Sequence, residues 1–222
     1  MGMHDEGGHA QAERHSNRRL IDRMLFFSDA VFAIVLTLLV LELRAPEMTD
    51  EVALRAALVQ LSPKFVAFAA SFSLVSIFWL AHMSTTRRLV VFDWTVAWLN
   101  LVFLFTIAIM PFVSALLGTR GPHGLSWQVY SASLVAASFA NVVLVFAVMR
   151  DRGRLVGGVT WRETVYRVFR AASPGIAFGA GLWFGLTGDE RLSSLCWILI
   201  PVFLAFARLL APPATGDASG AD

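Results

Sequence analysis

Long apolar runs separated by short polar connections make up most of the chain. The six runs lie at residues 24–43, 65–83, 94–117, 127–149, 171–187 and 192–210. Each run is close to the roughly 20 residues that a helix needs to cross a hydrocarbon core about 30 Å thick. Arg170 and Arg208 border the last two runs, and their long side chains can reach the membrane surface. The pattern predicts an all-α integral membrane protein with six transmembrane helices.

Two of the polar connections carry signals for helix starts. Residues 49–51 combine a threonine and two acids ahead of apolar residues at helical spacing, which predicts a short helix outside the membrane. Thr160 and Glu163 have the spacing of a capping box. The fifth transmembrane helix is therefore predicted to begin near Trp161, in the interface.

Charge and composition agree with a membrane location and add an orientation. The chain is 57% hydrophobic and 15% charged. One side of the predicted membrane holds only Arg44, Arg55, Lys64, Arg120 and Arg191, and the other 13 basic residues, all arginines, fall on the opposite side. By the positive-inside rule, both termini are predicted to be cytoplasmic. The same asymmetry explains the basic pI of 9.2, so no nucleic-acid partner is expected.

The hydropathy pattern divides the chain into three parts. Residues 1–22 are predicted to be a loose polar cytoplasmic tail that lacks the order of a secretory signal, residues 23–211 form the membrane domain, and residues 212–222 form a flexible tail. Cys196 is the one cysteine, so the sequence predicts no disulfide and no cysteine-based metal site. No cofactor is expected.

A serine and an aspartate, Ser28 and Asp29, interrupt the first apolar run. A carboxylate at a helix centre costs about 2.5 to 3.5 kcal/mol on insertion scales. His82 and Asn100 fall at a similar predicted depth in the second and third runs. We therefore predict a buried polar cluster in which Asp29 accepts hydrogen bonds. The candidate donors are His82, Asn100, Trp98 and a serine-type hydroxyl such as that of Ser28.

The first run also has an apolar stripe. Ile34, Leu38 and Leu41 share one side of the helix, with Thr37 on its flank. Asp29 points about 140° away from Ile34, so the acid and the stripe serve different surfaces. If this helix lined a pore, the stripe would form apolar rings in it. Ordinary helix packing or lipid contact is the alternative interpretation of the same pattern.

Three segments of the sequence resemble a known family. Arg23, Phe27, Ser28 and Asp29 reproduce the R-x-x-x-F-S-D signature of the transmembrane protein 175 family of potassium channels. The likeness continues through "FWLAH" at residues 78–82 and "DWTVAWLNLVFLF" at 93–105, and it extends to Pro111. Length and span count are similar to those of the single-repeat bacterial members, although beyond about residue 117 only hydropathy and span count agree.

The resemblance implies a homotetramer in a prokaryotic plasma membrane, with four copies of the first helix around a pore that conducts potassium. The chain contains no T-V-G-Y-G filter sequence, so the usual potassium channel fold is not expected. By position, Ile34, Leu38 and Leu41 correspond to the family's apolar constriction and Thr37 to a polar pore position. The residues that would fix the first helix against its neighbours are Arg23, Phe27, Ser28, Asp29, His82 and Asn100. Monovalent cations, potassium first, would be the permeant ions.

Two other function classes compete with a channel. A proton-coupled secondary transporter would use Asp29 and His82 as its relay. An intramembrane enzyme lacks support, because the sequence has no G-x-S-x-G, no H-E-x-x-H and no second aspartate inside a span. The sequence therefore favours a protein that is not an enzyme.

Overall fold

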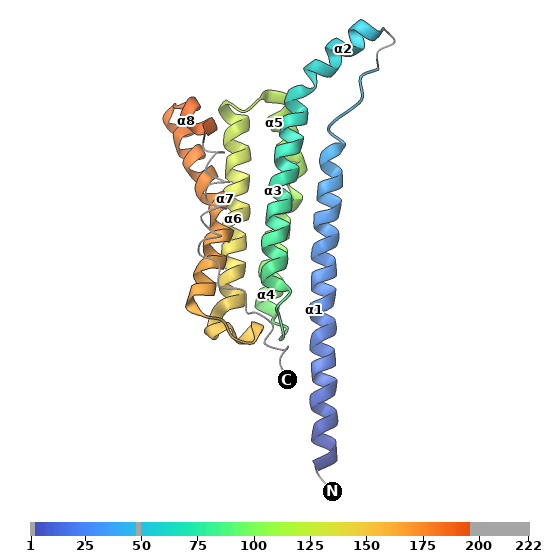
Figure 1. Ribbon diagram of the computed structural model, residues 1–222, viewed down its shortest axis with the longest axis vertical. Coiled ribbons are helices and arrows are strands. Elements are labelled where there is room, and N and C mark those ends of the chain that lie inside the picture. The colour runs from blue at the N-terminus through green and yellow to red at the C-terminus, as the bar shows by residue number, and fades with distance from the viewer. Residues whose placement is uncertain (1–2, 48–49, 196–222) are drawn as a thin grey trace, which may run out of the picture.

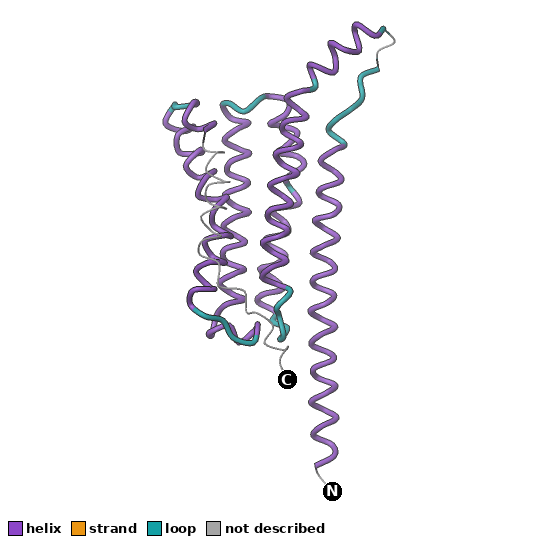
Figure 2. Tube along the Cα trace, viewed as in Figure 1, coloured by secondary structure: helices purple, strands orange, loops and turns teal. Residues whose placement is uncertain are grey.

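The computed structural model describes residues 3–47 and 50–195, and all regular structure in these ranges is helical (Figure 2). The elements in chain order are α1 (Met3–Val40), α2 (Glu51–Gln60), α3 (Ser62–Thr86), α4 (Trp94–Ala108), α5 (Met110–Arg120), α6 (Gly124–Gly153), the 3-10 helix η1 (Arg154–Val156), α7 (Trp161–Thr187) and α8 (Glu190–Leu195). Helices α3 to α7 stand upright in a bundle, and α1 runs along one side of it (Figure 1). The predicted all-α class is confirmed.

Four segments of the described chain are long and apolar enough to cross a membrane. They are Arg14–Val40, Ser62–Thr86, Trp94–Arg120 and Gly124–Arg150, which contain the first four predicted runs almost entirely. The third segment comprises two helices, because α4 ends at Ala108 and α5 begins at Met110 with Pro111 in its first turn. Proline lacks the N–H that would continue the ladder of hydrogen bonds. The fifth run lies within α7, and most of the sixth lies outside the described residues.

Helix α1 is much longer than its apolar run. The prediction of a loose tail is wrong from Met3 onward, because α1 continues without a break from Met3 to Val40. The segment before Arg23 contains no proline, and its alanine, glutamate, glutamine and arginine residues favour a helix, although Gly7 and Gly8 do not. A hydropathy pattern marks where a helix enters the membrane and does not mark where the helix begins.

Both predicted helix starts are confirmed by their caps. At α2, the Asp50 carboxylate accepts a hydrogen bond from the backbone N–H of Ala53 at 2.8 Å. At α7, the Thr160 hydroxyl oxygen accepts one from the N–H of Glu163 at 3.2 Å, and α7 begins at Trp161. These side chains satisfy backbone donors that have no partner within the helix.

A serine of α6 completes the hydrogen bonding of α7 next to a proline. Pro174 lies inside α7. The hydroxyl of Ser138 donates to the carbonyl of Ala171 at 2.6 Å and accepts from the N–H of Gly175 at 3.0 Å. Ser138 therefore bridges two backbone groups of α7 that would otherwise bond each other. This arrangement joins α6 to α7 in the middle of the bundle.

Gly175→Ala is expected to destabilise the protein. A β-carbon at Gly175 would lie 2.7 Å from both Cβ and Oγ of Ser138, whereas one at Gly179 would meet only Val135 Cγ2, at 3.8 Å. Forcing extra volume into a packed site costs about 1–3 kcal/mol. The measurement is the thermal unfolding midpoint of purified protein in detergent. Gly179→Ala, on the same helix, is the control and should leave the midpoint unchanged or raise it, because alanine favours helix.

Candidate functional site

A chain of buried polar side chains connects α3, α4 and α1. The ring nitrogen Nε2 of His82 lies 2.7 Å from Oδ1 of Asn100, and Nδ2 of Asn100 donates to Oγ of Ser28 at 2.9 Å. Ser28 in turn donates to the carbonyl of Met24 at 2.9 Å. The exposed fractions of Ser28, His82 and Asn100 are 0%, 2% and 1%, so water does not supply alternative partners. The structure thus brings together three of the predicted network residues.

The chemistry of these groups sets the direction of the hydrogen bonds. Ser28 has one hydroxyl proton and gives it to the Met24 carbonyl, so its oxygen must accept from the Asn100 amide nitrogen. The amide oxygen of Asn100 then faces His82 and can only accept, which places a proton on Nε2 of His82. Donation therefore runs from α3 through α4 into α1, and it ends on a backbone carbonyl.

Aromatic rings pack against His82, at one end of this polar chain. The His82 ring stacks on Phe103 at a centroid distance of 5.5 Å and an interplanar angle of 19°. Phe32 of α1 lies 5.9 Å from His82 and 6.0 Å from Phe103. Phe32 and Phe103 are almost fully buried. The polar chain and these rings together fix one face of α1 against α3 and α4.

Asp29 does not join the chain, and its predicted partners are wrong. Its Oδ1 accepts a hydrogen bond from Nε1 of Trp79 on α3 at 2.9 Å. Among the predicted donors, Trp98 is exposed, and His82 and Asn100 bond each other. Sequence reasoning missed Trp79, although it stands one helical turn before His82 in the same segment. Asp29 is exposed, so the prediction that it is buried in the polar cluster is wrong, although its hydrogen bond with Trp79 connects α1 to α3.

Two other predicted network residues lie elsewhere. Phe27 is exposed, and within the described chain Arg23 has an exposed side chain with no hydrogen bond or ion pair to another residue. Both point away from the buried face that Ser28 and Phe32 form on α1. They belong to the surface of this single chain.

The apolar stripe of α1 lies on the outside of the bundle. Ile34, Leu38 and Leu41 are 57%, 41% and 65% exposed, whereas Val35 and Leu39 on the other side of the helix are buried. Leu41 follows the last residue of α1 and continues its last turn through a hydrogen bond from its N–H to the Leu38 carbonyl. Thr37 is exposed, and its hydroxyl donates to the Ile34 carbonyl at 2.8 Å. The stripe therefore lies on the surface of the described chain.

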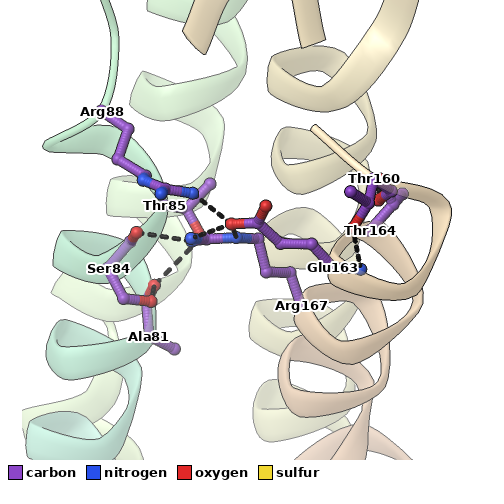
Figure 3. Close-up of polar contacts among 8 residues, drawn as sticks. All are labelled: Ala81, Ser84, Thr85, Arg88, Thr160, Glu163, Thr164 and Arg167. Carbon is purple, nitrogen blue, oxygen red and sulfur yellow. Dashed lines mark hydrogen bonds and ion pairs between the residues drawn. The ribbon is translucent and has the colours of Figure 1, made fainter. Parts of the chain in front are cut away.

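Ion pairs join α3 and α7 at the end of the bundle where α3 connects to α4. Glu163 accepts from Arg88, just after α3, and from Arg167 on its own helix at 2.9 Å (Figure 3). Arg167 also donates to the backbone carbonyl of Ser84, at 2.5 Å. The Glu163 carboxylate therefore does not return to its own helix start, as in a complete capping box. It holds two helices together instead.

A second ion pair lies beside the start of α4. Asp93 caps α4 by accepting from the N–H of Val96 at 3.1 Å, and it pairs with Arg150 at the end of α6. Partial burial raises the pKa of Asp93, but the hydrogen bond from Val96 and the charge of Arg150 outweigh it, so the pKa lies below its ordinary value. The ionised form is therefore the one that folding favours.

Asp93→Asn is expected to destabilise the protein at pH 7 and to have less effect in acid. Because the folded pKa of Asp93 is lowered, its charge contributes stability above the unfolded pKa of about 3.9, and this contribution is lost as the pH falls through the lower folded value. Asparagine caps a helix as well as aspartate does, so the variant removes only the charge. The measurement is the difference in unfolding midpoint between wild type and variant from pH 7 to pH 3. A difference that does not shrink in acid would contradict the assignment.

The features above define a class: an α-helical integral membrane protein. Residues 23–111 match the family model described as "Endosomal/lysosomal potassium channel TMEM175". A potassium channel of Chryseobacterium sp. is 30% identical over 131 residues, which cover 59% of this chain and 66% of that protein. One of Chamaesiphon minutus is 32% identical over 133 residues, covering 59% and 62%. Residues 23–111 of the chain are therefore similar to the TMEM175 family.

The fold has a solved counterpart. The crystal structure of a lysosomal potassium-selective channel TMEM175 homolog from Chamaesiphon minutus matches with a TM-score of 0.71 and 23% sequence identity, covering 85% of this chain and 98% of that chain. The zebrafish relative, named an endosomal/lysosomal proton channel, is 24% identical over 134 residues, which cover 60% of this chain and 26% of that protein. The sequence matches thus span less than two thirds of the relatives' length, whereas the structural match spans nearly a whole chain.

Proposed function

We propose that this protein is a potassium-permeable cation channel whose pore is lined by α1. The observation that carries the proposal is the division of α1 into two faces. Ser28 and Phe32 attach one face to α3 and α4, while Ile34 and Leu38 are exposed on another. One face of α1 is thus fixed to its own chain, and the apolar stripe on another face is exposed on the described chain. Such a helix suits the wall of a pore that several copies share. We take potassium as the permeant ion because the bacterial relatives are named potassium channels.

The proposed assembly is a homotetramer with α1 from each copy around the central axis. Six transmembrane helices, the fifth being α7, and two cytoplasmic termini complete the proposed topology, with residues 23–211 as the membrane domain and the prokaryotic plasma membrane as its location. The large exposed side chains of α1, Phe26 and Phe27 among them, leave apolar surface that neighbouring copies or lipid would cover. Closed rings of identical subunits use one such interface repeatedly.

Rings of Ile34, Leu38 and Leu41 would form the narrow part of the pore. Branched apolar side chains offer no oxygen ligands to an ion that has lost water, so a narrow ring blocks conduction by dewetting. Opening requires the ring to widen until a partly hydrated cation passes. Thr37 is the nearest oxygen donor on the flank of the stripe, and its hydroxyl proton is already given to the Ile34 carbonyl. Its free lone pairs would face the cation.

The transporter alternative has less support from the geometry. A relay through Asp29 and His82 needs a hydrogen-bonded path between them, but Asp29 bonds Trp79 and His82 bonds Asn100. The chain from His82 ends on the Met24 carbonyl, which has no proton to pass on. We therefore assign both residues to the positioning of α1.

Single-channel recording tests the proposal. Purified protein is fused with planar bilayers that have KCl on one side and NaCl on the other. Unitary currents that reverse toward the potassium equilibrium potential are expected, and a pH gradient without potassium shows whether protons share the path. A silent bilayer, combined with saturable proton-driven ion uptake into liposomes that Asp29→Asn abolishes, would reject the channel in favour of the transporter.

A further inference from the structure

A hollow of about 680 Å³ lies between the amino-terminal part of α1 and the connection that follows α3. Arg14 and Arg18 line it from α1, and Arg87 and Arg88 line it from the connection. Among the described lining residues, Asp22 is the one acid. Four arginines thus line the hollow with one aspartate, in a space large enough for a small headgroup.

Most of this positive charge has no counter-charge among the described side chains. Arg88 pairs with Glu163, outside the hollow. Among the side chains that the structure describes, which on α1 begin at Arg14, no ion pair involves Arg14, Arg18 or Arg87. Like charges gathered without partners repel one another and reduce stability. Such an arrangement is favourable when an anion binds among the arginines, since guanidinium groups match phosphate oxygens in geometry.

The walls of the hollow change from basic to apolar along α1. Arg14, Arg18, Ile21 and Leu25 follow one another at helical spacing, and all four line the hollow. The two arginines lie at the end farther from the apolar run, and Leu25 lies inside that run. An occupant with a charged head and an apolar tail would match this order.

Exposed aromatic residues place the hollow at the membrane surface. Trp94, at the start of α4 shortly after the connection, is 70% exposed. Trp161, at the start of α7, is also exposed. Tryptophans of this kind concentrate at the level of lipid headgroups, and basic pockets between helices on the cytoplasmic side bind anionic headgroups.

We propose that this hollow binds the phosphate of an anionic phospholipid, with Arg14, Arg18 and Arg87 as its ligands and Leu25 beside the acyl chain. The occupant would connect the amino-terminal part of α1 to the end of α3. The site is independent of the polar chain around Asn100, and binding is measured without ion flow, so it stands or falls separately from the proposed channel activity.

Native mass spectrometry with added phosphatidylglycerol tests the site on the purified full chain. The triple variant Arg14→Gln, Arg18→Gln and Arg87→Gln removes three positive charges. Each arginine near a membrane surface contributes about 1 kcal/mol to anionic lipid binding, so the affinity should fall by about 100-fold. If the triple variant does not fold, Arg87→Gln alone should weaken binding about fivefold.

Matched controls separate a site from general attraction. Arg44→Gln, Arg55→Gln and Arg120→Gln remove the same charge from the other end of the bundle and should leave the affinity unchanged. Equal losses in both triple variants, or no loss in either, would overturn the proposal. Inorganic phosphate at millimolar concentration should not displace the lipid, because it makes no contact with the apolar wall. Displacement by phosphate would make this a site for the free anion and would overturn the assignment to lipid.

Discussion

Leu38→Ala is expected to raise the unitary potassium current several-fold over wild type. Leu38 lies at the middle of the exposed stripe, between Ile34 and Leu41. In the proposed tetramer, the substitution shortens four side chains at one level of the pore. A wider and less apolar ring keeps water in the constriction, which lowers the barrier for a cation that cannot find ligands there.

The measurement is single-channel recording in symmetrical KCl, with Val40→Ala as the matched control. Val40 is exposed on the same helix two residues later, but it points about 160° away from Leu38. Its truncation should leave the unitary current unchanged. If the current is the same in Leu38→Ala, Ile34→Ala and Leu41→Ala as in wild type, the stripe does not line the narrow part of the pore.

Asn100→Leu is expected to lower the free energy of unfolding by about 2–4 kcal/mol. The substitution removes both hydrogen bonds of Asn100 and leaves Nε2–H of His82 buried without an acceptor. An unsatisfied buried donor costs about 1–3 kcal/mol in addition to the lost bonds. For a chain of this length, the unfolding midpoint in detergent should fall by about 5–10 °C.

A second buried asparagine supplies the control. Asn141 on α6 is as buried as Asn100, but among residues 3–47 and 50–195 neither its amide oxygen nor its amide nitrogen has a hydrogen-bond partner. Asn141→Leu removes unsatisfied polar atoms at nearly constant volume, so it should leave the unfolding midpoint unchanged or raise it. Equal decreases in the two variants would mean that the polar chain contributes nothing specific.

The sequence predicts the depth of the polar residues in the membrane well, but it does not predict their hydrogen-bond partners. Counting residues along each apolar run places Ser28, His82 and Asn100 at one level of the membrane, and the structure joins them there. The same count cannot give the rotation of each helix about its axis. That rotation decides that Trp79 and not Trp98 reaches Asp29.

Two further features were beyond sequence reasoning for different physical reasons. The part of α1 before its apolar run is polar, and a hydropathy pattern does not measure whether a polar segment forms a helix. The contact of Ser138 with α7 depends on a backbone donor and acceptor next to Pro174 that exist only once the helix has formed. Interactions between distant parts of a chain leave little trace in local patterns.

Because α1 is one unbroken helix, a tilt of its membrane part would also move its amino-terminal end. At 1.5 Å per residue, its 38 residues extend about 57 Å, nearly twice the thickness of the hydrocarbon core. Figure 1 shows its amino-terminal end reaching well past the other helices. A tilt of about 5° around Arg23, where the apolar run begins, would therefore move this end, about 30 Å away, by roughly 3 Å. A spectroscopic label near the amino terminus would report motions of the constriction, amplified by the helix that forms it.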